Sequence, residues 1–202
     1  MGGLGAAALV LGSNGLISQR GGYGELVADP GGVIDLPPKF KYRIISEEGS
    51  TLSSGAPVPG DHDGMVASRG RGDTTILVRK HELRPSDTVT GNAPVPQKTP
   101  YDPAAPGGTT AIVVDNVGRR EIRDYVTSSG TLNYCASEAT PWGTWLTCEE
   151  DRTTHHGYVF EVNPRDPQNN LSRTPIRGMG IFSHEAVDID PRSGLAYLTL
   201  LP

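Results

Sequence analysis

The sequence predicts an all-β protein, and three observations support this prediction. Gly (26) and Pro (17) are spread along the 202-residue chain as turn signals, without forming low-complexity tracts. Between them lie short runs that alternate apolar and polar residues, as half-buried strands do. No segment of useful length carries apolar residues at helical spacing. This pattern is typical of a β domain with many turns.

Charge and hydropathy exclude two classes of partner. The formal net charge is -5, so the chain lacks the basic footprint of a nucleic-acid-binding protein. The apolar run at residues 4–11 is too short to span a bilayer, so no stable membrane insertion is expected. It resembles the apolar part of an export signal but has no positively charged start. Residues 1–22 are therefore interpreted as the remnant of an export signal or as a disordered N-terminus.

The domain is expected to cover residues 23–202. The first strands are predicted at residues 40–45, 62–68 and 74–80, where β-branched and alternating residues occur. The tripeptide Arg71-Gly72-Asp73 resembles an adhesion motif, but it occurs where a hairpin turn is needed, and we interpret it as that turn.

The second half of the chain repeats a strand-turn theme. The Pro-rich segment 84–106 is predicted to be an insertion or lid, and a hairpin of strands 109–115 and 121–128 follows it. Segments 157–164 and 185–199 each hold a short alternating strand closed by Asp or Asn and then by Pro or Gly. Such units suggest propeller blades. About ten strands make only two or three blades, so we expect an incomplete propeller, the N-terminal part of a longer protein.

Residues 130–151 hold the densest chemistry, with both cysteines, both tryptophans and an acidic run. Cys135 lies among polar residues that suit a thiolate metal ligand, whereas Cys148 is either a buried small residue or the disulfide partner of Cys135. Trp142 and Trp145 are expected to pack and fix the turn. Glu149 and Glu150 repel each other, which a cation relieves, and in a strand only one of them would face a site.

Three imidazole–carboxylate pairs occur at strand ends and would converge at one rim or axis of a propeller. They are His62-Asp63, His81-Glu82 and His184-Glu185. The adjacent histidines His155 and His156 are interpreted as part of an exposed loop.

These motifs resemble the N-terminal half of the PhoX-type alkaline phosphatases, over residues 23–199. The matching blocks include HDGM at 62–65, HEL at 81–83, TPWGTWLTCEE at 140–150, HGYVFEV at 156–162 and FSHEAV at 182–187. The block around Trp142 is the most specific of them.

The resemblance implies a six-bladed propeller that hydrolyses phosphate monoesters with a cluster of iron and calcium ions, outside the cytoplasm after twin-arginine export. It also implies a thiolate ligand at Cys135 and carboxylate ligands at Glu149 or Glu150 and at Glu185, which together form the catalytic group. His62, Asp63, His81, Glu82 and His184 are then expected on the substrate side or behind the ligands. No serine nucleophile is needed, and the chain has no Gly-x-Ser-x-Gly elbow.

The chain departs from the family pattern at three places. Ser137-Glu138 replaces a Gly-Gly pair, Lys80 replaces an Asn before His-Glu, and the chain ends at Leu200-Leu201-Pro202 before the remaining ligands would occur. We therefore expect a phosphomonoesterase whose activity in this chain is open. The alternatives are an inactive propeller fragment that acts as a binding module, and a calcium-dependent propeller lactonase, which would not need a cysteine.

Overall fold

The computed structural model describes residues 22–96, 99–135, 138–153, 155–167, 169 and 171–202, and the chain divides into two compact units, residues 1–43 and 44–202. The predicted export-signal remnant, apart from Gly22, lies outside the described residues. In the first unit the Asp29 carboxylate accepts hydrogen bonds from the Val33 amide (2.8 Å) and the Tyr42 hydroxyl (2.7 Å). These bonds organise a loop joined by a single bridge between Val27 and Leu36.

The predicted strand at residues 40–45 is wrong. These residues are irregular, and Phe40, Tyr42 and Ile44 are exposed. The alternating pattern is present, but no neighbouring strand among the described residues offers a hydrogen-bond ladder to it. An unpaired strand is not stable in water, so the alternation alone does not produce one.

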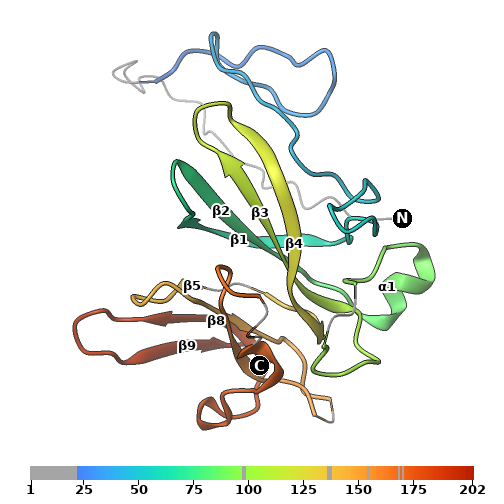
Figure 1. The fold of residues 1–202 in the computed structure, drawn as a ribbon, viewed down its shortest axis with the longest axis vertical. Coiled ribbons are helices and arrows are strands. Elements are labelled where there is room, and N and C mark those ends of the chain that lie inside the picture. The colour runs from blue at the N-terminus through green and yellow to red at the C-terminus, as the bar shows by residue number, and fades with distance from the viewer. Residues whose placement is uncertain (1–21, 97–98, 136–137, 154, 168, 170) are drawn as a thin grey trace, which may run out of the picture. The chain divides into compact units, whose positions relative to one another are not determined.

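The second unit begins with a four-stranded antiparallel sheet (Figure 1). Its strands are β1 (His62–Arg69), β2 (Thr74–His81), β3 (Gly107–Asp115) and β4 (Arg120–Thr131), in that spatial order. The Arg-Gly-Asp tripeptide forms the β1–β2 turn as predicted, with Gly72 at φ +63° and the Gly70 amide bonded to the Thr74 carbonyl. The β3–β4 hairpin is also confirmed.

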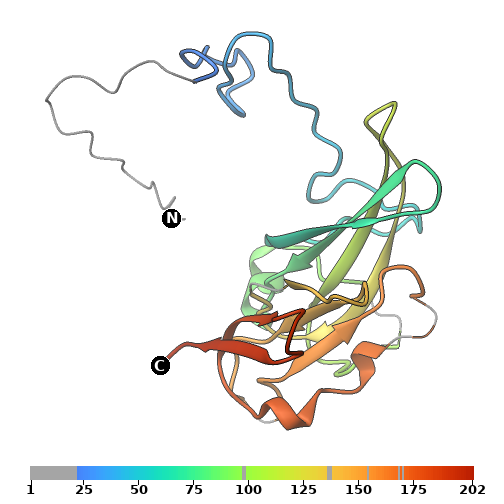
Figure 2. The same cartoon turned by 90° about the vertical axis from the view of Figure 1, so that its left-hand side faces the viewer.

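Two smaller antiparallel sheets follow (Figures 1 and 2). One contains β5 (Glu138–Ala139), β6 (Trp145–Cys148) and β7 (Val159–Val162), and the other contains β8 (His184–Ile189) and β9 (Ala196–Leu200). Short 3-10 turns, η1 (Leu171–Arg173) and η2 (Arg177–Met179), connect them. The strands predicted within 157–164 and 185–199 are therefore present.

One short helix, α1 (Pro85–Thr90), lies in the Pro-rich segment 84–106, where no helix was predicted. Pro85 occupies its first position, and the Asp87 carboxylate accepts the Arg84 amide at 2.6 Å. Gly91 ends the helix at φ +116°. A six-residue helix is too short to show apolar residues at helical spacing, so the residues at its two ends are the only signals of this helix in the sequence.

The core lies on both faces of the sheet formed by β5, β6 and β7, which is the middle one of the three. On one face Trp145 packs against Ile76, Val78, Ala111 and Val113 of the first sheet. On the other face Leu146 and Cys148 pack against Val187 and Ile189 of the third sheet. The predicted packing role of Trp145 is confirmed. Trp142 is 60% exposed, and its indole nitrogen donates to the Glu161 carboxylate at 2.7 Å, so its packing role was predicted wrongly.

The described residues thus form open antiparallel sheets, none of which closes on itself. The all-β class is confirmed, and the propeller stays a prediction. Within the described part of the chain, no helix is long and apolar enough to cross a membrane.

Candidate metal centre

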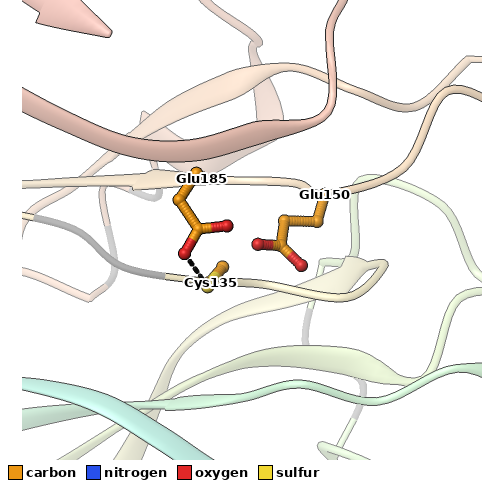
Figure 3. Close-up of side chains that lie close together, drawn as sticks. All are labelled: Cys135, Glu150 and Glu185. Carbon is orange, nitrogen blue, oxygen red and sulfur yellow. Dashed lines mark hydrogen bonds between the residues drawn. The ribbon is translucent and has the colours of Figure 1, made fainter. Parts of the chain in front are cut away.

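A thiol and two carboxylates meet beside the middle and third sheets. The ligand atoms of Cys135, Glu150 and Glu185 all lie within 4.8 Å of one another, and each residue is half-buried (Figure 3). The Cys135 sulfur lies 3.7 Å from Glu185 Oε1 and donates to it. The three residues are far apart in sequence, so their convergence depends on the fold.

Backbone pairing produces this convergence. Tyr134 and Glu149 form an antiparallel bridge, and the Cys135 amide donates to the Cys148 carbonyl at 3.2 Å. The segment leading to Cys135 therefore runs beside the end of β6 and brings the thiol near Glu150. The His184 amide donates to the Glu149 carbonyl at 3.0 Å, which places the start of β8, and with it Glu185, at the same point.

Asn133 supports the Glu150 carboxylate. It adopts φ +45°, a conformation that Asn tolerates better than most residues, and its carbonyl accepts the Glu150 amide at 2.9 Å. Its side-chain amide donates to Glu150 Oε2 at 3.2 Å. Of the family departures, Ser137 lies outside the described residues, and Glu138 is exposed in β5.

The electrostatics of the cluster favour a cation. Burial, together with the hydrogen bond that the protonated Glu150 makes with the neighbouring Glu185 carboxylate, raises the pKa of Glu150 to about 7. Two carboxyl groups this close resist simultaneous ionisation, and a bound cation removes that penalty. One soft sulfur and two hard carboxylate ligands suit a transition metal such as iron, and three protein ligands leave positions for water or substrate. The residues present therefore fit a metal ion.

Glu149 does not belong to this cluster. Its carboxylate is fully buried and accepts four hydrogen bonds, from the amides of Leu132 (3.0 Å), Gly157 (2.9 Å) and Tyr158 (3.2 Å) and from His156 Nδ1 (2.8 Å). Gly157 is at φ +86°, and a Cβ there would lie 2.3 Å from the Asp151 carbonyl oxygen. Residue 157 must therefore be glycine for the backbone to lie this close to the Asp151 carbonyl group. Glu149 is the centre of a buried hydrogen-bond network that holds this part of the structure.

His156 is buried, so its interpretation as exposed loop is wrong, whereas His155 is exposed as expected. The His156 ring connects Glu149 to Asp102, whose Oδ2 lies 3.2 Å from His156 Nε2. Burial lowers the pKa of His156, but the hydrogen bonds and charges of Glu149 and Asp102 outweigh burial and raise the pKa above its ordinary value. Asp102 comes from the Pro-rich segment, and nothing in the local sequence signals this long-range contact.

The pairs His62-Asp63 and His81-Glu82 do converge. His62 is paired with His81 across β1 and β2, and their ring centroids lie 5.3 Å apart. His81 Nδ1 donates to the Gly60 carbonyl at 2.8 Å, and burial lowers the pKa of His81 to about 3, so the ring is neutral. Asp63 and Glu82 line a polar hollow of about 330 Å³ that also includes Asn133, the residue bonded to Glu150.

His184 behaves differently from these two histidines. It is fully buried at the start of β8, next to the Phe182 ring at a centroid distance of 5.5 Å. It lies outside the hollow that the other two pairs share, and only its neighbour Glu185 reaches the metal cluster.

Cys148 is the buried small residue of the two interpretations, because no disulfide joins it to Cys135. Burial raises the pKa of the Cys148 thiol to about 12, which keeps it protonated.

A feature that the sequence did not reveal lies beside Cys148. Lys80 is fully buried, and its Nζ has no hydrogen-bond partner among the described residues. Burial lowers the pKa of Lys80, while the nearby carboxylates of Asp63 and Glu82 favour the protonated form.

Comparison with known protein families gives a match. The model of the family described as alkaline phosphatase PhoX matches the chain over residues 21–154 and 151–200. Searches of curated proteins and of solved structures returned no match.

Proposed function

Because this chain belongs to the PhoX family of alkaline phosphatases, which are metal-dependent, we propose that it hydrolyses phosphate monoesters at a metal centre held by Cys135, Glu150 and Glu185. The observation that carries the proposal is the convergence of one thiol and two carboxylates within 4.8 Å, from three segments that only the fold brings together. The proposed cofactors are iron and calcium, and the proposed architecture is part of a six-bladed propeller.

The roles of the chain's own residues follow from their contacts. The Glu185 carboxylate accepts the Cys135 thiol hydrogen, which holds the sulfur beside the two carboxylates. Because all three ligands must be deprotonated, the thiol proton would be released to solvent when a cation is bound. Asn133 orients the Glu150 carboxylate. When bound, the cations neutralise phosphate oxygens and activate a nucleophile, so the chain itself need not supply a serine. A calcium ion would add further positive charge to the centre, and carboxylate and other oxygen ligands can coordinate it.

The residues behind the cluster position it. Glu149 fixes Gly157 and Tyr158, the two residues that lead into β7, through two of its four hydrogen bonds, and we propose this structural role for it in place of a ligand role. His62 and His81 are held by backbone carbonyl groups of Pro59 and Gly60. We therefore propose that they shape the neighbouring polar hollow.

The substrate and location follow from the family. The proposed substrate is a small phosphate ester, which needs bound cations here because Asp61, Asp63 and Glu82 line the adjacent hollow and would repel it. We further propose a periplasmic or secreted location after twin-arginine export, on family membership alone.

The test is hydrolysis of p-nitrophenyl phosphate by the purified chain with Fe²⁺ and Ca²⁺ supplied. Activity is expected in the wild type and in the buried-thiol control Cys148→Ala, and its loss is expected in Cys135→Ala. Turnover that survives in Cys135→Ala would remove the thiolate from the proposed centre. A lactonase would instead cleave a lactone with calcium alone in both variants, and a binding module would bind the ester without turnover.

A further inference from the structure

A second hollow lies at the opposite end of the first sheet from the metal centre. It has a volume of about 460 Å³ and is lined by Gly70, Arg71, Thr74, Ile76, Val113, Arg123, Tyr125 and Arg165. Thr74 begins β2 and His81 ends it, so seven residue steps at about 3.3 Å each separate the two ends by roughly 23 Å. The hollow is therefore a separate place from the Cys135 cluster.

Its charge is opposite to that of the whole chain. Three of the eight lining residues are arginines and none is acidic, although the net charge of the chain is -5. Among the described residues, none of Arg71, Arg123 and Arg165 forms an ion pair with a carboxylate, and the pair that Arg120 forms with Asp115, at 3.7 Å, does not involve a lining residue of the hollow. The positive charge of the three lining arginines is thus left without a paired carboxylate.

Two of these arginines are held in place by neutral groups. The Arg165 guanidinium donates to the carbonyl of Arg69 (3.1 Å) and to that of Gly143 (2.9 Å), which fixes its position and leaves its charge uncompensated. Arg123 lies over the ring of Tyr125, 5.1 Å from the centroid. Fixed guanidinium groups are suited to the oxygens of a phosphate group.

The rest of the lining is apolar. Ile76 and Val113, from neighbouring positions of β2 and β3, contribute their aliphatic side chains. The Tyr125 hydroxyl already donates to the Pro164 carbonyl at 2.5 Å, so the ring offers mainly apolar surface. Arg123 and Arg165 also line a neighbouring hollow, but Asp124 and Asp166 line that one, which makes it less suited to an anion.

We propose that this arginine hollow, defined by Arg71, Arg123 and Arg165 with the floor of Ile76 and Val113, binds a small organic phosphate. The guanidinium groups hold the phosphate oxygens, and the apolar part of the ligand rests on the aliphatic floor and the Tyr125 ring. The volume lies within the range of small-molecule sites, about 300–1,000 Å³. The site is independent of the metal centre, because no metal ligand contributes to it.

Titration calorimetry with phenylphosphonate tests the proposal, with a chelator present so that the metal centre does not contribute. Phenylphosphonate carries a phosphate-like group on an aromatic ring and has no ester bond to hydrolyse. We expect the whole chain to bind it more tightly than inorganic phosphate, and we expect Arg71→Gln and Arg123→Gln each to weaken binding by about tenfold.

Arg120→Gln is the matched control, since it removes an exposed arginine of the same sheet that does not line the hollow. It is expected to bind like the wild type. Thermal unfolding verifies that each variant is folded; Arg71 is exposed, so at least that variant retains its fold. Absence of binding by the wild type, or equal binding by Arg71→Gln, Arg123→Gln and Arg120→Gln, would overturn the site. Equal affinity for inorganic phosphate would overturn its assignment to an organic ligand.

Discussion

Glu149 and Glu150 are adjacent in the chain, but their carboxylates belong to different parts of the structure. Glu149 accepts four hydrogen bonds in a fully buried network that includes His156, whereas Glu150 lies in the half-buried group with Cys135 and Glu185. Successive side chains of an extended chain point to opposite faces, which explains why the two carboxylates are separated. It divides the acidic pair into a structural residue and a proposed ligand.

Exchange of each carboxylate for an amide should separate the two roles. Glu149→Gln replaces one acceptor oxygen by a donor that faces existing donors, so we expect it to lower the free energy of unfolding by at least about 2 kcal/mol. Glu150→Gln should change that free energy by less than about 1 kcal/mol but weaken metal binding. Urea unfolding and a metal titration of both variants measure the difference. Equal destabilisation by the two substitutions would contradict the division.

His156 should make stability depend on pH. Its pKa in the folded state lies above the ordinary value, because Glu149 and Asp102 outweigh the effect of burial. Protonation then favours folding, so the contribution is complete below the unfolded pKa of about 6.5 and disappears as pH rises through the folded pKa. The difference in unfolding free energy between the wild type and His156→Gln should therefore be larger at pH 6 than at pH 9. A difference that grows with pH would contradict this sign.

Metal affinity should rise with pH through the neutral range. Burial and the neighbouring Glu185 raise the pKa of Glu150 to about 7, so below that pH a cation must displace a proton from the carboxyl group. We expect tighter cobalt binding at pH 8 than at pH 6, with a smaller pH effect in Glu150→Gln. Calorimetry in buffers of different ionisation enthalpy measures the released protons. An affinity that does not change between these pH values would contradict the carboxyl as ligand.

Lys80 is a buried cation without a hydrogen-bond partner among the described residues. Its replacement by Met keeps most of the volume and removes the unsatisfied group, which is expected to raise the free energy of unfolding by roughly 1–3 kcal/mol. Removal of the charge should also strengthen cation binding at the neighbouring cluster. Lys41→Met, at an exposed position, is the control and should change neither quantity. A Lys80→Met protein less stable than the wild type would show that the ammonium group has a stabilising partner.

Local patterns predicted the hairpins well, because a turn residue and two alternating strands carry their own information. Gly72 in the β1–β2 turn and the strands around Val78 are examples. The pattern at residues 40–45 failed because strand formation depends on a distant partner, and helix α1 is too short to have a period.

The site was predictable in part. Residue types identified Cys135 and Glu185 as candidates for the cluster, and the strand repeat required a choice between Glu149 and Glu150. The burial of His156 and Lys80 was not predictable, because contacts between segments far apart in the chain create both environments.

The most direct test of the metal centre is the thiolate-to-metal charge-transfer band in the near ultraviolet during a Co²⁺ titration of the purified chain. The band should appear in the wild type and in Cys148→Ala, be weakened in Glu150→Gln and Glu185→Gln, and be absent in Cys135→Ser. A band of full strength in Cys135→Ser, or no band in the wild type, would contradict a metal centre held by Cys135, Glu150 and Glu185.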